Sequence, residues 1–325
     1  MAPAKYTFDV TAAPNCTSDY AVFPVNASTG YTRAHVQGTF TNGAQIAGRT
    51  ATISIQPTGE AAVALTLTAS ATSNTGLNFE VSATAATNAT NLAAAINRNL
   101  SSAALDRVVA VASGNTVTVY ALTPGNRVTL TRAETLARFT WGGVANGTNG
   151  TQANIVAFNE LYSGPVPGLS LCDFTNPIFI FSYASGVGPV ATSPTLSLDG
   201  TEIAYVENDP NIGAIFHVLT FGSGSTEYGT AASCVNNNNG GVTLPTCATS
   251  PVVPGSTAGS TATDFMLPLG LVAANAATGI AGAADSFSSP FVSYYADVTY
   301  VGDDNGYLYA IGLECRSNGA RTRVP

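Results

Sequence analysis

Charged residues are scarce in this sequence, since Asp, Glu, Lys and Arg together make up 9% of the chain. An average globular protein carries about 25%. Lys5 is the single lysine, and the formal net charge is −8. Binding to nucleic acid or to an anionic membrane surface needs a positive face. The composition therefore argues against both kinds of partner.

Cysteine and histidine are also few, at five and two residues. No two cysteines form a C-x-x-C pair, so we expect no structural zinc site. The sequence lacks a G-x-S-x-G elbow, an H-E-x-x-H motif, a P-loop and a G-x-G-x-x-G loop. His35 and His217 lie in strand-like segments, where a hydrogen-bonded or solvent-facing histidine is the expected role. We therefore predict no catalytic residue.

Ala, Thr, Ser, Asn and Gly take the place of charges, a composition that fits a secreted protein in which disulfides persist. We predict an extracellular, cell-surface or periplasmic location, with the export signal not present in this chain, because residues 1–10 lack an apolar core. Residues 265–284 carry no charge over a length that could span a membrane. Pro268 and several glycines interrupt them, so we predict a strand, a turn and a loop, and no membrane span.

Two segments share one pattern, Thr192–Phe221 and Ser288–Ile311. Each reads Ser-Pro, an alternating apolar strand, a turn, a second strand that contains Tyr-Val, a polar turn and a third strand. Apolar alternation around Asp-Gly and Asn-Gly predicts hairpins. Repeated meanders suggest a propeller or a stacked array of sheets. Pro194 and Pro290 lie 96 positions apart, about two blades at the usual period of 40 to 50 residues.

The strings LDGTEIAYV (198–206), AANAATGIAG (273–282) and YVGDDNGYLYAI (300–311) carry a family resemblance. The first resembles the SPDG-type strand pair of bacterial propellers, and the others resemble repeats of pyrroloquinoline-quinone-type propellers. The resemblance implies a blade fold over about residues 192–311. Asn275 stands where the family usually has Asp, and no tryptophan follows Thr278-Gly279, so the quinone cofactor is not implied.

Residues 41–150 read as an inserted α+β (ββαββ) unit. Its predicted strands and helix lie at 51–55, 62–68, 88–100, 108–112, 116–121 and 127–131. NATNLAAAINRN and GNTVTVYALTPGNRVTLT resemble a small domain of phage tail and bacterial surface proteins. Residues 32–40 and 151–158 resemble each other, as two flanking strands of one host domain would. We therefore predict a discontinuous propeller-like domain over 1–40 and 151–311, and a disordered or abnormal tail over 312–325.

Four of the five cysteines are assigned to disulfides. Cys234 and Cys247 lie in a Gly- and Asn-rich loop that their bond would close. Cys16 and Cys172 flank the insert, so its removal brings them near in sequence. Cys315 is left unpaired.

Acidic turns and clustered tyrosines are the candidate binding residues. Asp303, Asp304 and Asn305 could ligate calcium through oxygen atoms, although Asp and Asn before Gly are what tight turns require. Exposed tyrosines can serve as platforms for sugars, which singles out Tyr294, Tyr295 and Tyr307 as ligand-binding candidates. Tyr307 and Tyr309 stand at alternate positions, so we expect these two side chains to share one face and pack between blades, with ligand binding as the alternative for Tyr307.

The function that best fits these observations is a non-enzymatic secreted or cell-surface recognition or scaffold protein. Its partner would be a carbohydrate or a protein. The alternative is a polysaccharide hydrolase or lyase that uses carboxylates of the propeller, and two or more carboxylates converging with a histidine or arginine in one pocket would favour it. Too few blades are recognisable to close a ring, so we also expect an open arc of blades with residues 307–311 at an edge. A truncated reading frame, or self-association through that open edge, would account for it.

Overall fold

The structure is a computed structural model of the chain. It describes residues 4–6, 14–16, 19–99, 108–166, 170–172, 177–220, 251–256, 262–270, 285–296 and 298–312. Strands make up 47% of it and helix 7%, which confirms the predicted mainly-β class. Several antiparallel sheets are present, and none of them closes on itself.

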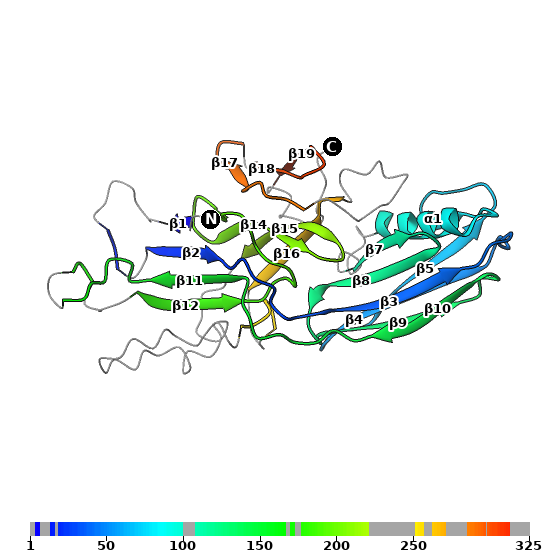
Figure 1. Ribbon diagram of the computed structural model, residues 1–325, viewed down its shortest axis with the longest axis horizontal. Helices are drawn as coiled ribbons and strands as arrows, with labels where there is room; N and C mark the ends of the chain where they lie inside the picture. Colours follow the sequence, from blue (N-terminus) through cyan, green and yellow to red (C-terminus); the bar gives the residue numbers. More distant parts are fainter. Residues whose placement is uncertain are drawn as a thin grey trace.

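Three of the sheets are antiparallel meanders whose strands follow chain order (Figure 1). Sheet I contains β1 (Ala4–Tyr6), β2 (Tyr20–Pro24), β11 (Ile155–Asn159) and β12 (Ile178–Tyr183). Sheet II contains β13 (Thr195–Leu196), β14 (Glu202–Asp209), β15 (Gly213–Thr220) and β16 (Thr263–Pro268). Sheet III contains β17 (Phe291–Ser293), β18 (Val298–Gly302) and β19 (Leu308–Gly312). Within the described residues β19 lies at a sheet edge, as predicted.

The two repeated segments form neighbouring sheets. β13 contacts β17, and the hydroxyl of Thr195 donates to the carbonyl of Pro290 at 2.6 Å. The 96 positions between Pro194 and Pro290 therefore separate two sheets that contact each other. β15 and β16 pair in one sheet although residues 221–262 separate them in the sequence.

Sheets IV and V, together with helix α1, form an α+β unit. Sheet IV contains β10 (Phe139–Ala145), β3 (Arg33–Phe40), β8 (Thr116–Pro124) and β7 (Val108–Ser113). Sheet V contains β6 (Asn78–Glu80), β5 (Val63–Ser70), β4 (Thr50–Pro57) and β9 (Val128–Glu134). Apolar residues from both sheets share one core with α1 (Ala85–Arg98), which packs on β7 and β8. The five strands predicted in this region are confirmed, and β6 and β10 are additional.

Helix α1 begins three residues before the predicted Asn88, after Thr84. Asn88 bonds both backbone groups of Ser82, at 2.6 and 2.8 Å, and so fixes the chain that enters the helix. Asn97, near the other end, bonds both backbone groups of Ala110 on β7 at 2.8 Å. Both asparagines therefore act as structural links within the unit.

Strand β3 belongs to sheet IV, where β8 and β10 are its neighbours. A boundary after residue 40 would separate this strand from both of its partners, so the unit defined by strand pairing includes Arg33–Phe40. Residues 151–158, which resemble those of β3, enter β11 in sheet I instead. The two similar segments therefore lie in different sheets.

Sheet II lies between sheets I and III. Successive residues of a strand point to opposite faces. One face of sheet II carries Ile203 and Leu219, which pack on Val22 and Ile155 of sheet I. The opposite face packs on sheet III through a second cluster that contains Val206, Phe216, Val301 and Tyr309. Both faces of sheet II are thus covered by neighbouring sheets.

Candidate functional site

A cluster of charged side chains is buried where sheet II meets the α+β unit. Tyr205, Glu207 and Asp209 stand at alternate positions of β14, so they share one face of the sheet. His217 of β15 lies directly opposite Tyr205. Asp264 of β16 projects from the same face, and Arg33 enters from the start of β3.

Arg33 and His217 bridge the three carboxylates. The Arg33 guanidinium donates to Asp209 through Nε at 2.8 Å and to Glu207 through Nη2 at 3.0 Å. His217 Nε2 lies 3.1 Å from Glu207 Oε2, and its Nδ1 lies 3.0 Å from Asp264 Oδ2. The result is a continuous chain of ion pairs that joins β3 to three strands of sheet II.

Backbone amides complete the hydrogen bonds of two of these carboxylates. Glu207 Oε1 accepts from the amides of Val187 and Gly188. Asp209 Oδ1 accepts from the amides of Asn211 and Ile212, at 2.8 and 3.0 Å. A side chain at position 186 would overlap the Glu207 carboxyl group, which explains a glycine there.

Burial and neighbouring acids compete to set the pKa of His217. Burial opposes the charged imidazolium, but the charge of Asp264 and hydrogen bonds to Asp264 and Glu207 outweigh it and raise the pKa to about 9. His217 is therefore a cation at neutral pH. Its ring stacks on Tyr205 with centroids 4.6 Å apart and planes 7° apart.

The pKa values of Glu207 and Asp264 are shifted in opposite directions. Burial alone would raise the pKa of Glu207, but Arg33 and His217 together hold it below its usual value. For Asp264 burial prevails over its pairing with His217, and its pKa is raised. The charge of Glu207 is thus the better compensated of the two.

The cluster is closed to solvent. The exposed fractions of the side chains are 2% for Arg33, 0% for Glu207, Asp209 and His217, and 6% for Asp264. A general acid or base must reach its substrate within hydrogen-bond distance. In this arrangement the acids contact protein groups, so the cluster is suited to holding β3 against sheet II.

The His217 pairing predicts a loss of stability on the alkaline side. Its folded pKa of about 9 lies above the ordinary 6.5, so its contribution is complete below pH 6.5 and is lost as the pH rises through 9. One pKa unit corresponds to about 1.4 kcal/mol, so we expect a loss of about 3 kcal/mol. Urea unfolding between pH 6 and 10 measures it. The variant His217→Gln serves as control, and an equal pH slope in both proteins would refute the assignment.

The three candidate tyrosines do not form one surface. Tyr294 and Tyr295 lie in the turn between β17 and β18, whereas Tyr307 lies in the turn at the other end of β18. All three are exposed, and Tyr295 is fully so. The expectation that Tyr307 and Tyr309 pack together between sheets is wrong for Tyr307, which precedes β19. Tyr309 lies within that strand and is buried.

The acidic turn has a structural explanation. Asp303 Oδ1 accepts from the amides of Asn305 and Tyr307, each at 3.0 Å. Its Oδ2 accepts from the hydroxyl of Tyr309 at 2.5 Å, and burial together with this contact raises the pKa of that tyrosine. The amide of Asp304 donates to the carbonyl of Asp285. The bonds from Asn305 and Tyr307 to Asp303 are those of a tight turn, and calcium binding there stays a prediction.

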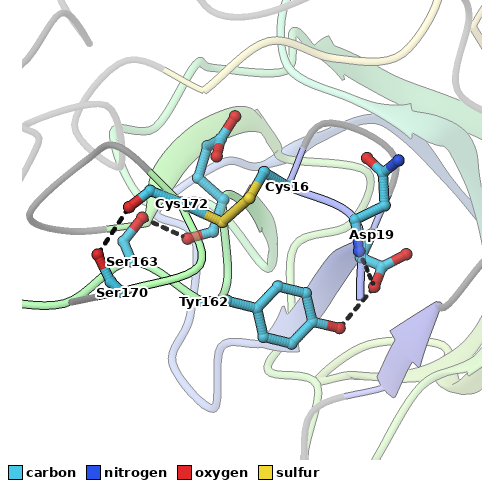
Figure 2. Close-up of a disulfide and its surroundings, with 8 residues drawn as sticks. Cys16, Asp19, Tyr162, Ser163, Ser170 and Cys172 are labelled. Atoms are coloured by element: carbon cyan, nitrogen blue, oxygen red, sulfur yellow. Dashed lines mark hydrogen bonds between the residues drawn. A yellow bond between two sulfur atoms is a disulfide. The ribbon is translucent and has the colours of Figure 1, made fainter. Parts of the chain in front are cut away.

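The predicted disulfide Cys16–Cys172 is confirmed, and it closes a sequence separation of 156 residues. Figure 2 shows Tyr162 beside it, with the hydroxyl directed at Asp19, which it contacts at 2.5 Å. Cys16, Cys172 and Glu160 also form the one group of His, Cys, Asp and Glu with metal-ligand spacing in the described chain. Metals bind the thiolate form, and these two sulfur atoms are bonded to each other. Cys234, Cys247 and Cys315 lie outside the described residues.

Sequence reasoning missed Arg33 and Asp264. The alternation of Tyr205, Glu207 and Asp209 on one apolar strand was a usable signal, because it places two acids on a buried face. Both acids then need a buried cation. Only the packing of β3 on sheet II identifies that cation as Arg33.

Comparisons with family models, with curated proteins and with solved structures gave no match. In the part of the chain that the structure describes, every helix is too short or too polar to cross a bilayer.

Proposed function

We propose that the chain is a non-enzymatic recognition or scaffold protein of the cell exterior, with sheets I–III as propeller-type blades. Three observations support this arrangement. The strands of each sheet follow chain order, the first strands make contacts in the order β1, β13 and β17, and the repeated segments form adjacent sheets. The disulfide is consistent with an oxidising compartment.

The α+β unit is proposed as an insertion between two paired strands. β2 and β11 are neighbours in sheet I, although the chain between them forms the whole of sheets IV and V. Insertions are tolerated where the ends of a domain lie close together. The unit is also anchored, because Ile212 and Ile215 of the β14–β15 hairpin join its core.

The observation that carries the non-enzymatic proposal is the burial of the acid cluster. A polysaccharide hydrolase needs two carboxyl groups about 5 to 10 Å apart with sugar between them. The acids that converge with His217 and Arg33 are instead bonded to protein groups and excluded from solvent. Recognition would then fall to exposed side chains.

Tyr294 and Tyr295 are the proposed recognition residues, with a carbohydrate as ligand. The Tyr294 hydroxyl donates to the carbonyl of Leu196 at 2.9 Å, which fixes a half-exposed ring. The neighbouring Tyr295 projects fully into solvent. The ring of Tyr294, held by a hydrogen bond, and the exposed ring of Tyr295 could together stack against a sugar.

The expected result for Tyr295→Ala is a loss of carbohydrate affinity of about tenfold, the equivalent of about 1.4 kcal/mol. A polysaccharide array followed by calorimetry identifies the ligand and measures its affinity. Tyr307→Ala, at the other end of the hairpin, is the matched control and should bind normally. Turnover of any polysaccharide that is abolished by Glu207→Gln or Asp303→Asn would overturn the proposal.

A further inference from the structure

The face of sheet III that points away from sheet II is apolar and, among the described residues, exposed at several positions. Val301 and Tyr309 point toward sheet II. On the opposite face Phe291, Tyr300 and Ala310 lie side by side in register, and Leu308 follows on the same face. Phe291 is 66% exposed and Leu308 is 74% exposed. Clustered exposed apolar side chains commonly mark interaction sites.

Sheet I has the corresponding outer face at the other end of the stack. Val22 and Ala157 pair in register and point toward sheet II. Phe23 and Val156 pair in register on the outer face, where Phe23 is 36% exposed. Phe158 packs edge-on against Phe23, with ring centroids 5.7 Å apart. Phe23 is thus exposed on this face, with Val156 and Phe158 half-buried beside it.

We propose that the outer face of sheet III packs on the outer face of sheet I of a second copy of this chain. The contact would repeat the relation by which sheet I packs on sheet II and sheet II on sheet III. Each copy carries both faces, so two copies related by a twofold axis would make two equal contacts and close. Six sheets would result, within the four to eight blades of closed propellers. The inference rests on the propeller-type arrangement proposed above.

Light scattering during size-exclusion chromatography tests the association. The wild-type chain, of 32.9 kDa, should elute with twice that mass. Leu308→Glu and Phe23→Glu should each give the single-chain mass, because each variant damages both contacts of a dimer. Leu198→Glu is the matched control, since Leu198 is as exposed as Leu308 but lies in the β13–β14 turn. Val156→Glu, on the same outer face of sheet I, repeats the test should Phe23→Glu fail to fold, as circular dichroism would show.

Mixing Phe23→Glu with Leu308→Glu identifies which faces meet. One contact of the mixed pair joins two unaltered faces, so a heterodimer should return at reduced affinity. A contact of sheet III with the sheet III of another copy would leave Phe23→Glu dimeric, and that result would overturn the proposal. A wild-type chain that is monomeric at about 100 µM, where weak association is still populated, would also overturn it. Tyr295-dependent carbohydrate binding, measured on the same variants, reports the recognition proposal separately.

Discussion

Replacing Arg33 with methionine should lower the free energy of unfolding by about 3 to 5 kcal/mol. Methionine keeps much of the volume but leaves Glu207 and Asp209 in the interior without the cation that contacts both. Removing one partner of a buried ion pair is costly because the remaining charge is uncompensated. The loss should be accompanied by weaker attachment of β3 to sheet II, measurable as faster amide exchange at the start of β3.

Chemical unfolding monitored by circular dichroism measures the Arg33 effect. Arg49→Met removes an exposed arginine and should change stability by less than about 0.5 kcal/mol. The loss of unfolding free energy in Arg33→Lys should fall between the losses in Arg33→Met and Arg49→Met, because lysine keeps the charge but not the forked geometry that reaches both acids. Equal effects of Arg33→Met and Arg49→Met would show that the cluster does not stabilise the fold.

Removing the Cys16–Cys172 disulfide should have a comparably large effect. The bond closes a separation of 156 residues, for which the chain-entropy relation gives about 5 kcal/mol. The closed loop contains the entire α+β unit, so its opening releases the largest constraint on the unfolded chain. The double variant Cys16→Ala/Cys172→Ala, unfolded under oxidising conditions, measures the loss.

Ser170→Ala is the control for the disulfide variant. Its hydroxyl donates to the carbonyl of Cys172 at 2.7 Å, so this variant perturbs the same loop and should lose about 1 kcal/mol. A smaller loss in the double cysteine variant than in Ser170→Ala would contradict the assignment. Peptide mapping of the non-reduced protein provides a second check, since a Cys16–Cys234 link would also refute it.

Local patterns in the sequence predicted the strands well because strand formation depends on local alternation and turn residues. Asp199-Gly200 is an example: Gly200 has φ of +70°, and the carboxylate of Asp199 accepts from the amide of Thr201. The relation between segments was harder to predict. The long connection between β15 and β16 hid the pairing of these two strands in one sheet. β3 likewise pairs with strands that follow it by some eighty residues or more.

In the candidate site, too, contacts within one hairpin could be predicted, whereas contacts between distant segments could not. Of the two roles expected for His217, hydrogen-bonded or solvent-facing, the structure shows the first, and its partner Glu207 lies on the neighbouring strand of the same hairpin. Arg33 reaches the cluster through the packing of two sheets, which no local pattern encodes. Tyr307 was misplaced because the alternation with Tyr309 extends into a turn, where strand geometry no longer applies.

We propose that the convergence of Glu207, Asp264, His217 and Arg33 stabilises the protein and performs no chemistry. Parallel measurement of polysaccharide turnover and unfolding free energy in the wild type and in Glu207→Gln tests it most directly. We expect no turnover by either protein and a clear loss of stability in the variant, because Arg33 and His217 lose their shared acceptor. Turnover by the wild type that disappears in an equally stable Glu207→Gln protein would contradict it.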